Sequence, residues 1–411
     1  FAPFLNSLAT EIMPKHNIEA FFDSRQANTF KEKQKAFMSY LDVYTKPEEI
    51  VSSGPFLFSE LISGERIIMN KNPHFFVKDK DGNSLPYADK VVYTFSADAG
   101  AAIFRFFADE IFYISSSPNN AALMKSLEKK YDYTLYEMGP SAGTSFFWFN
   151  LSRNVSEPKY SWFNNKEFRR AMSYAIDREA IIKNVFQGMA EPLYTAEPRI
   201  SPFFNENLKE YPQDINRARG ILKNQGFTLK ENQLYDQKSN RVEFDIYTNS
   251  GGKEREQMAV IIQADLEELG IKTNIKILEF NNFIGKLMQS KDYDAGVLAL
   301  TGGNEPNSGA NVWRSDGRLH LFDIKSAQEN PVIHNWEKEV DHIFNIGVQT
   351  LDFQERKEIY DEFQAIIYEE NPLIYIASPL TFTIAKHKVK NIRKTKYGCI
   401  LPHLYDAIIE E

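Results

Sequence analysis

The side chains of this 411-residue sequence that could carry out chemistry do not stand at the spacings of the common cofactor and metal motifs. None of the seven histidines forms a His-Glu-x-x-His pair, which would hold zinc on one face of a helix. The phosphate loop Gly-x4-Gly-Lys and the dinucleotide motif Gly-x-Gly-x-x-Gly are absent, and Gly302-Gly303 is typical of a tight turn. His320 stands between Leu319 and Leu321, which favours a partly buried histidine with satisfied hydrogen bonds. We therefore expect no enzyme, no cofactor and no metal site.

A second set of side chains is suited to holding a ligand rather than transforming it. Trp148 and Trp313 could supply apolar walls to a binding site, and packing in a core is an equal alternative for both. For Phe283 the core is the more common location. Arg314 and Arg318 stand in a polar, turn-like stretch and could clamp a carboxylate, although a solvated loop arginine is at least as common.

Length and composition limit the class of protein. At about 150 residues per domain the chain is too long for one compact core, so we expect two lobes. The sequence is 43% hydrophobic, which is sufficient for substantial cores. Its net charge of −8 disfavours nucleic acid as a partner. No apolar run approaches the roughly 18–20 residues needed to cross a bilayer, and the single cysteine, Cys399, excludes an intrachain disulfide.

The elements that must position these candidates change in character near residue 165. Before it, apolar segments at 56–58, 66–70 and 91–95, separated by turn residues, predict a β-rich lobe with a few helices. After it, apolar residues at helical spacing predict one helix over 168–187, which Gly188 would end.

The following segments alternate between helical and strand patterns. Asp214 is expected to cap a helix that ends before Gly226. Alternation over 242–246, a helical repeat over 258–269 and alternation over 271–277 then predict a βαβ unit with a parallel strand pair.

A buried strand is predicted over 293–300, and it ends in the loop 301–306. Loops at the carboxyl ends of strands are where open α/β sheets bind ligands. Asp352 should start a helix that runs to about Glu370, followed by a short strand over 373–377.

Several segments together resemble the peptide/nickel family of extracellular solute-binding proteins, the receptors that deliver ligands to ABC importers. Phe168-Arg169-Arg170-Ala171-Met172-Ser173-Tyr174-Ala175-Ile176-Asp177-Arg178 is similar to the family signature VRQALAYAIDR. The order and spacing of the other blocks also follow the family pattern. These blocks are residues 53–56, 64–67, 72–76, 85–90, 214–227, 304–306 and 311–320.

The resemblance implies an α/β, two-lobed, periplasmic-binding-protein-like fold of the large, peptide/nickel-binding class, with mixed sheets and hinge strands that close on a ligand. Residues 1–155 and 379–411 would form a partial lobe I, and residues 156–378 a second α/β lobe, lobe III. The sequence looks like the latter three quarters of a typical member, without its N-terminal quarter.

The function implied is capture of oligopeptides, or of similar small solutes, and their delivery to the permease subunits of an ABC transporter. We expect a monomer in the periplasm or, if a lipid anchors it, on the outer face of the cytoplasmic membrane. An oligosaccharide-binding receptor of the same fold is the alternative, because stacked aromatic rings with Asn and Glu side chains suit sugar faces. A secreted hydrolase is the alternative from a different class.

A receptor for many peptides must pair with the ligand backbone while tolerating its side chains, so a strand end beside wet, roomy pockets is expected. In oligopeptide-binding members, an aspartate before the Asn-Glu-Pro turn pairs with the amino terminus of the peptide. The matching position here is Gly302, which cannot form that ion pair. The candidate ligand-binding residues are Trp148, Asn150, Phe283, Leu300, Gly302, Asn304, Glu305, Trp313, Arg314, Arg318 and Tyr375.

Overall fold

The computed structural model describes residues 15–37, 46–47, 50–303, 305–323, 334–393 and 401–410. The chain divides into two compact units. Unit 1 is mainly Gly139–Thr381, and unit 2 combines Leu5–Met138 with Phe382–Glu411. Strand β13 (Leu373–Lys386) therefore contributes to both units. The sequence predicted only its first part, residues 373–377, so that prediction was too short. The assignment of these regions to lobes I and III stays a prediction.

A mixed sheet with the strand order β11-β10-β12-β6-β13 forms the centre of unit 1. Strand β10 (Glu243–Asn249) pairs in parallel with β11 (Lys272–Leu278) and with β12 (Ala295–Leu300). Strand β6 (Thr144–Phe149) runs antiparallel to β12 and to β13. Helix α10 (Lys253–Glu268) connects β10 to β11, which confirms the predicted βαβ unit.

Further helices and strands complete unit 1. Strand β7 extends the sheet by pairing with β13, and β8 and β9 form a hairpin. These remaining elements are α6 (Lys159–Asn164), α7 (Lys166–Ala175), α8 (Arg178–Val185), β7 (Ala190–Pro192), α9 (Ile215–Asn224), β8 (Thr228–Lys230), β9 (Gln233–Tyr235), α11 (Phe280–Gly285), the π-helix η2 (Lys286–Ser290), the 3₁₀ helix η3 (Pro306–Gly309), α12 (Ala310–Trp313), α13 (Asn335–Gly347) and α14 (Phe353–Glu370).

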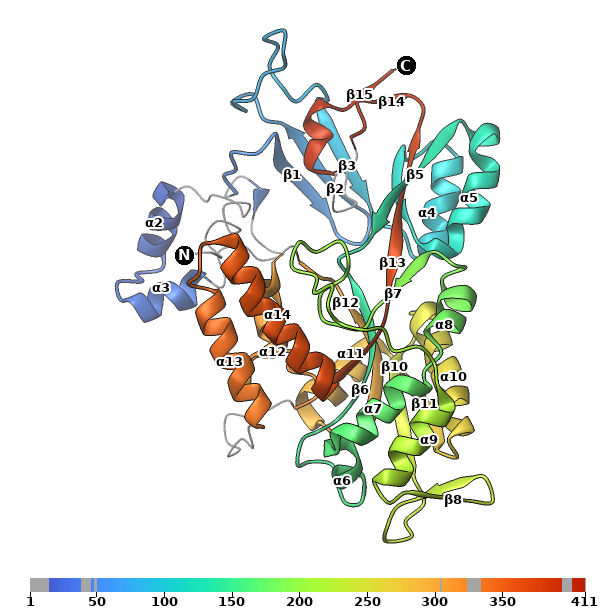
Figure 1. Cartoon of the computed structure of the whole chain (residues 1–411). Helices are drawn as coiled ribbons and strands as arrows, with labels where there is room; N and C mark the ends of the chain where they lie inside the picture. Colours follow the sequence, from blue (N-terminus) through green and yellow to red (C-terminus); the bar gives the residue numbers. More distant parts are fainter. Residues whose placement is uncertain are drawn as a thin grey trace. The chain divides into compact units, whose positions relative to one another are not determined.

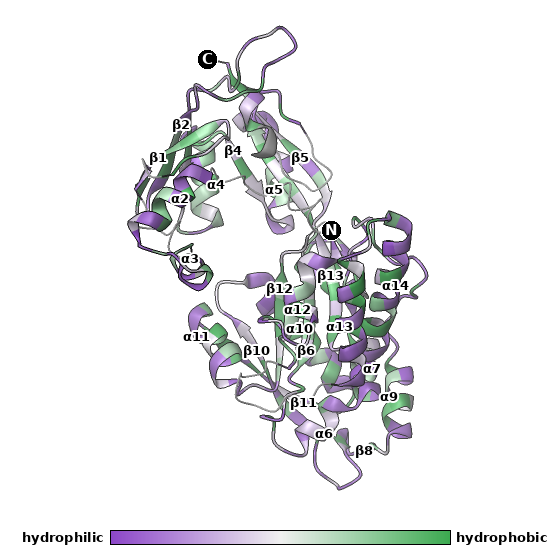
Figure 2. Ribbon diagram, turned by 90° about the vertical axis from the view of Figure 1, so that its left-hand side faces the viewer, coloured by the Kyte–Doolittle hydropathy of each residue, from purple (hydrophilic) through white to green (hydrophobic). Residues whose placement is uncertain are grey.

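Helices cover both faces of this sheet because successive side chains of β6 point to opposite faces. The ring of Phe149 lies 5.7 Å from that of Phe168 in α7, on the face that α7 and α10 cover. The ring of Phe146 lies 6.0 Å from that of Tyr375, on the other face. Figure 1 shows α13 and α14 on this second side of the sheet. Both carry hydrophilic and hydrophobic residues, as expected for helices with one covered face (Figure 2).

The prediction of one helix over 168–187 is wrong, because α7 ends at Ala175 and α8 begins two residues after Ile176. The side chain of Asp177 accepts a hydrogen bond from the backbone N–H of Ala180 at 2.8 Å and caps α8. Apolar spacing continues across the break, so periodicity alone could not locate it.

Three other predicted helix boundaries are confirmed. Asp214 accepts a hydrogen bond from the N–H of Arg217 at 2.8 Å, and Gly226 follows the C-cap of α9 with a φ of 81°. Asp352 accepts one from the N–H of Glu355 at 2.9 Å and so starts α14.

Unit 2 contains the three strands expected in the first part of the chain, as an antiparallel sheet in the order β1-β2-β3. A separate small core of Phe106, Met124, Tyr133 and Ile384 holds α4 and α5 against the second half of β13. No helix in the described part of the chain is both long and apolar enough to span a bilayer. The elements are α2 (Lys15–Ser24), α3 (Phe30–Phe37), β1 (Phe56–Ile62), β2 (Arg66–Lys71), β3 (Lys90–Thr94), α4 (Ala99–Phe107), β4 (Tyr113–Ser116), α5 (Pro118–Tyr131), β5 (Tyr133–Pro140), β14 (Val389–Lys390), the 3₁₀ helix η4 (Leu401–Asp406) and β15 (Ile408–Ile409).

Candidate functional site

A cavity of about 240 Å³ lies within unit 1, where β12 ends. The sheet contributes Thr144 and Phe146 from β6 and Tyr375 from β13. The loop after β12, η3 and α12 form the opposite wall. The cavity therefore occupies the strand-end position at which open α/β sheets bind ligands.

The structure brings five of the sequence candidates together around this cavity. These five are Leu300, Gly302, Glu305, Trp313 and Tyr375. Asn304 lies outside the described residues. Whether these side chains contact a ligand stays a prediction, but their common position makes this cavity the candidate site.

Trp148 and Asn150 are not among the residues that line the cavity. Trp148 is fully buried, and its indole occupies the space beside Gly296 that a side chain at position 296 would need. The side-chain amide of Asn150 donates to the carbonyl oxygens of Lys291 and Tyr293 at 3.1 and 2.9 Å. Both residues therefore stabilise the packing at the far end of β6 in this structure.

The remaining three candidates also do not line the cavity. Phe283 is fully buried in the main core of unit 1. The guanidinium of Arg314 donates to Asp316 at 3.0 Å and to Asn345 at 2.6 Å, so its donors are engaged at the surface. Arg318 is exposed.

Gly302 allows a close approach between two loops that border the cavity. A Cβ atom at this position would overlap the backbone carbonyl of Ala142, in the loop before β6. Because backbone cannot move aside as a flexible side chain can, Gly302→Ala is expected to lower the free energy of unfolding by about 1–3 kcal/mol in urea denaturation.

The control for this prediction is Gly220→Ala. Gly220 is exposed in α9, and its added Cβ would meet nothing within 4 Å. Alanine favours the helix more than glycine, so this change should raise stability by up to about 1 kcal/mol. Equal stability of Gly302→Ala and the wild type would contradict the close approach.

Helix α14 holds Glu305 in place through Arg356. The guanidinium of Arg356 donates to Oε1 of Glu305 and, at 2.9 Å, to the carbonyl oxygen of Gly347. The same carboxylate oxygen accepts a hydrogen bond from the N–H of Asn307 at 3.0 Å and caps η3. Glu305 is thus fixed between the loop after β12 and α14.

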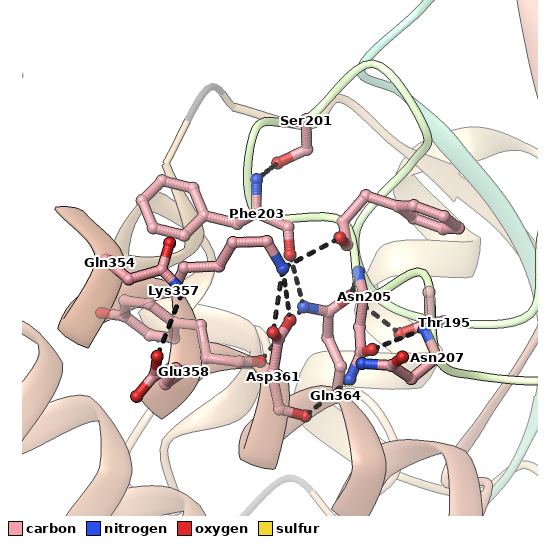
Figure 3. Close-up of polar contacts among 12 residues, drawn as sticks. Thr195, Ser201, Phe203, Asn205, Asn207, Gln354, Lys357, Glu358, Asp361 and Gln364 are labelled. Carbon is pink, nitrogen blue, oxygen red and sulfur yellow. Dashed lines mark hydrogen bonds and ion pairs between the residues drawn. The ribbon is translucent and has the colours of Figure 1, made fainter.

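Helix α14 also fastens the loop that carries Glu197, a second carboxylate of the cavity. The amide of Gln364 donates to the carbonyl oxygen of Phe203 at 2.7 Å and accepts from the N–H of Asn205 at 3.0 Å (Figure 3). The ammonium group of Lys357 donates to the same loop, at 3.2 Å from the carbonyl oxygen of Phe204. One helix therefore positions both carboxylates.

The environment of Glu197 changes its acidity. Burial raises the pKa of its carboxyl to about 7, against the lowering effect of the Ser201 hydroxyl, which donates to it at 2.6 Å. The charge of Glu305 adds to the increase. Burial, with a contribution from Glu197, also holds the pKa of the Tyr375 hydroxyl well above its usual range.

Sequence reasoning missed Glu197, Arg356 and Gln364. Nothing in the local sequence distinguishes Glu197 from other loop glutamates. The signal for the other two was present, because Arg356 and Gln364 share the helical face of Tyr360, Phe363 and Ile367, which are all buried. Polar residues on an apolar helix face need partners in the interior.

Residues 139–143 read Gly-Pro-Ser-Ala-Gly and match the Gly-x-Ser-x-Gly spacing of a hydrolase nucleophile elbow. That motif requires a turn from a strand into a helix, whereas this segment joins β5 to β6. The Ser141 hydroxyl donates to the carbonyl oxygen of Gly143 at 3.3 Å and accepts from the N–H of Gly143 at 3.1 Å. These are contacts of a turn, so the structural context of an elbow is missing.

The prediction for His320 is confirmed in its hydrogen bonding. Its side chain is 1% exposed, and its two ring nitrogens lie 2.9 Å from the carbonyl oxygen of Val312 and 2.8 Å from Oε1 of Glu337. This pair joins α12, which carries Trp313, to α13.

Comparison with known proteins identifies the family. Residues 10–318 match the family model of the bacterial extracellular solute-binding proteins, family 5 (middle). The chain belongs to this family. The resemblance seen in the sequence is thereby confirmed.

Two curated relatives are similar over most of the chain. A probable ABC transporter-binding protein of Deinococcus radiodurans is 30% identical over 360 residues, covering 82% of this chain and 59% of that protein. The oligopeptide-binding protein AppA of Bacillus subtilis is 24% identical over 385 residues, covering 90% of this chain and 62% of that protein. The chain thus spans 59–62% of the length of these two relatives.

Solved structures show the same fold. AppA from Bacillus subtilis, in complex with a nonapeptide, has a TM-score of 0.67 at 22% identity and covers 87% of this chain and 66% of its own. NikZ from Campylobacter jejuni, in complex with Ni(L-His), has a TM-score of 0.70 at 19% identity, with coverages of 86% and 68%. The predicted class, an α/β periplasmic-binding-protein-like fold, is confirmed.

Proposed function

We propose that this protein is the substrate-binding protein of an ABC transporter and that it captures oligopeptides outside the cytoplasmic membrane for delivery to the permease. Family membership supports the transport role. Oligopeptides are favoured because relatives over most of the chain are named as oligopeptide-binding or dipeptide-binding proteins. Location in the periplasm or on the outer face of the cytoplasmic membrane, and the monomeric state, belong to the same proposal.

The observation that carries the proposal is the strand end inside the cavity. The last ladder pair of β12 is Leu300 with Thr144, and Thr301, Gly302 and Gly303 line the cavity beyond it. Main-chain groups past a strand end can pair with the backbone of an extended ligand whatever its side chains are. A peptide offers the matching donors and acceptors along its whole length.

The test is a ligand panel on the full-length protein, read as the melting temperature. A ligand that binds only the folded state adds RT ln(1 + [L]/Kd), or about 2.7 kcal/mol at a hundredfold excess over Kd. We expect tri- to pentapeptides to raise the melting temperature, and native mass spectrometry to find carried-over peptide.

Three other results would contradict this proposal. A rise with cellotetraose and none with peptides would favour the oligosaccharide receptor, and a rise with Ni²⁺ and histidine alone would favour a nickel chelate. Turnover of peptides or glycosides would establish a hydrolase.

A further inference from the structure

Arg178 places a positive charge in the interior of unit 1. The residue is 3% exposed, so its guanidinium is shielded from water. Burial lowers its pKa to about 10, which leaves it charged at neutral pH, and no carboxylate among the described residues forms an ion pair with it. A buried charge without an opposite charge is costly, so hydrogen bonds must replace the contacts with water.

The guanidinium of Arg178 joins four separate segments through uncharged acceptors. Its Nε donates to the carbonyl oxygen of Tyr375 in β13 at 2.8 Å and to that of Leu193, just after β7, at 3.3 Å. Its terminal nitrogens donate to the carbonyl oxygen and the hydroxyl of Ser173 in α7 at 2.8 and 3.0 Å. A further bond of 3.4 Å reaches the carbonyl oxygen of Tyr211. One planar group with fixed donor directions thus connects these segments.

Two of the four segments lead into the lining of the cavity. Tyr375 itself lines it, and Leu193 stands three residues before the part of its loop, residues 196–198, that also lines it. Regular strand pairing ends at this point. The register between β6 and β13 shifts between Tyr375 and Ala377, and the last pair of β7 with β13 is Pro192 with Ala377. The spacing between the two segments therefore depends on contacts beyond the ladder.

The contacts of Arg178 are suited to set that spacing. One backbone hydrogen bond continues the pairing, from the N–H of Leu193 to the carbonyl oxygen of Ile376 at 3.0 Å. The guanidinium carbon of Arg178 lies 5.0 Å from the centre of the Tyr194 ring, within the range of an attractive cation–π contact. Arg178 therefore holds the first two residues of the loop, one through its carbonyl oxygen and one through its ring.

We propose that Arg178 is a positioning residue of the candidate site, because its guanidinium fixes the distance between Tyr375 and the loop that contains residues 196–198. This inference rests on the proposed peptide-binding function. Arg178 does not line the cavity. It acts on the ligand through Tyr375 and the loop, and it thereby sets how tightly, and with what preference for ligand size, the cavity binds.

The experiment compares Arg178→Lys with Arg169→Lys in the full-length protein. Arg169 is the matched control because it is 2% exposed and none of its hydrogen-bond partners lines the cavity. Its guanidinium donates to the carbonyl oxygens of Phe163 and Glu370 at 2.7 and 2.8 Å, and to the carboxylate of Glu370 at 3.3 Å. Lysine lacks the planar fork of arginine, so both variants should lose stability.

The affinities for Ala-Ala-Ala and Ala-Phe-Ala are measured by calorimetry, at a temperature at which circular dichroism shows each variant to be folded. We expect Arg178→Lys to weaken the binding of at least one of the two peptides by about tenfold, the scale of one hydrogen bond to a charged group. The ratio of the two affinities should change as well. Arg169→Lys should leave both affinities and their ratio within about threefold of the wild type, since partial unfolding does not alter the preference of the folded protein.

Ser173→Ala provides a second variant if Arg178→Lys does not fold. It removes one acceptor of the guanidinium and leaves Arg178 in place. We expect the same changes at a smaller size, about threefold in affinity, which corresponds to one ordinary hydrogen bond.

A second measurement needs no ligand. Amide hydrogen exchange, followed by mass spectrometry, should be faster in Arg178→Lys than in Arg169→Lys for residues 193–198 and 375–377. The two variants are compared at conditions of equal global stability. A loss of global stability alone would accelerate exchange to the same extent in both.

The outcomes separate the inference from the proposed function. Equal effects of the two lysine variants on the affinities and on their ratio would overturn the inference, and the peptide-binding function would stand. If the wild type binds no peptide, the proposed function fails. Hydrogen exchange then decides by itself whether Arg178 holds the two parts of the cavity lining together.

Discussion

Replacing Trp313 by alanine is expected to lower the free energy of unfolding by about 3–5 kcal/mol and to weaken ligand binding as well. Trp313 is 5% exposed, and its ring packs against those of Phe363, Phe322 and Tyr375 at 5.2, 6.0 and 6.5 Å. It also lines the cavity. One side chain therefore serves the core and the candidate site, so its removal should affect both.

The two effects can be separated by denaturant titration and calorimetry on a small set of variants. Trp313→Phe keeps an aromatic wall and should restore most of the stability, with a smaller loss of affinity. Phe280→Ala is the control, since Phe280 is 49% exposed and its removal should change stability by less than about 1 kcal/mol. If the folded Trp313→Ala variant bound the ligand as tightly as the wild type, Trp313 would belong to the core alone.

Glu337→Ala is also expected to lower the free energy of unfolding by about 3–5 kcal/mol, because it would leave the Nε2 atom of the buried His320 without its partner. Both side chains are at most 1% exposed. The ring nitrogens of His320 each face an acceptor, the carbonyl oxygen of Val312 and the carboxyl of Glu337. One proton must therefore lie between His320 and Glu337, whichever of the two carries it.

Loss of the Glu337 side chain should also weaken the start of α13. The second oxygen of Glu337 accepts the backbone N–H of His334 at 2.8 Å, as part of a capping box. Glu339→Ala is the matched control, because Glu339 is exposed two residues further along the same helix. In urea denaturation, the midpoint should fall for Glu337→Ala and stay unchanged for Glu339→Ala. Equal midpoints for the two variants would contradict a shared buried proton.

The sequence determined many of the local elements of this protein and its family, although it did not show the break between α7 and α8 or the full length of β13. Alternating and helical apolar spacing located β10, α10 and β11, and the side chains of Asp214 and Asp352 marked the starts of α9 and α14. These features depend on residues within a few positions of each other, so they can be predicted from sequence. The family followed from short blocks in a conserved order, and the loop after β12 marked the place of the cavity.

Tertiary structure decided which side chains meet at the cavity. From the sequence, Trp148 and Trp313 were equal candidates for the binding site. In the structure, Trp148 is packed in the core beside Gly296, whereas α12 brings Trp313 to the cavity. Glu305 meets Arg356 across 51 residues, and Glu197 comes from a loop that Gln364 fastens across more than 150. Such contacts depend on how sheet, loop and α14 pack together. No local spacing encodes that packing, because side chains become neighbours only after distant segments of the chain have folded onto one another.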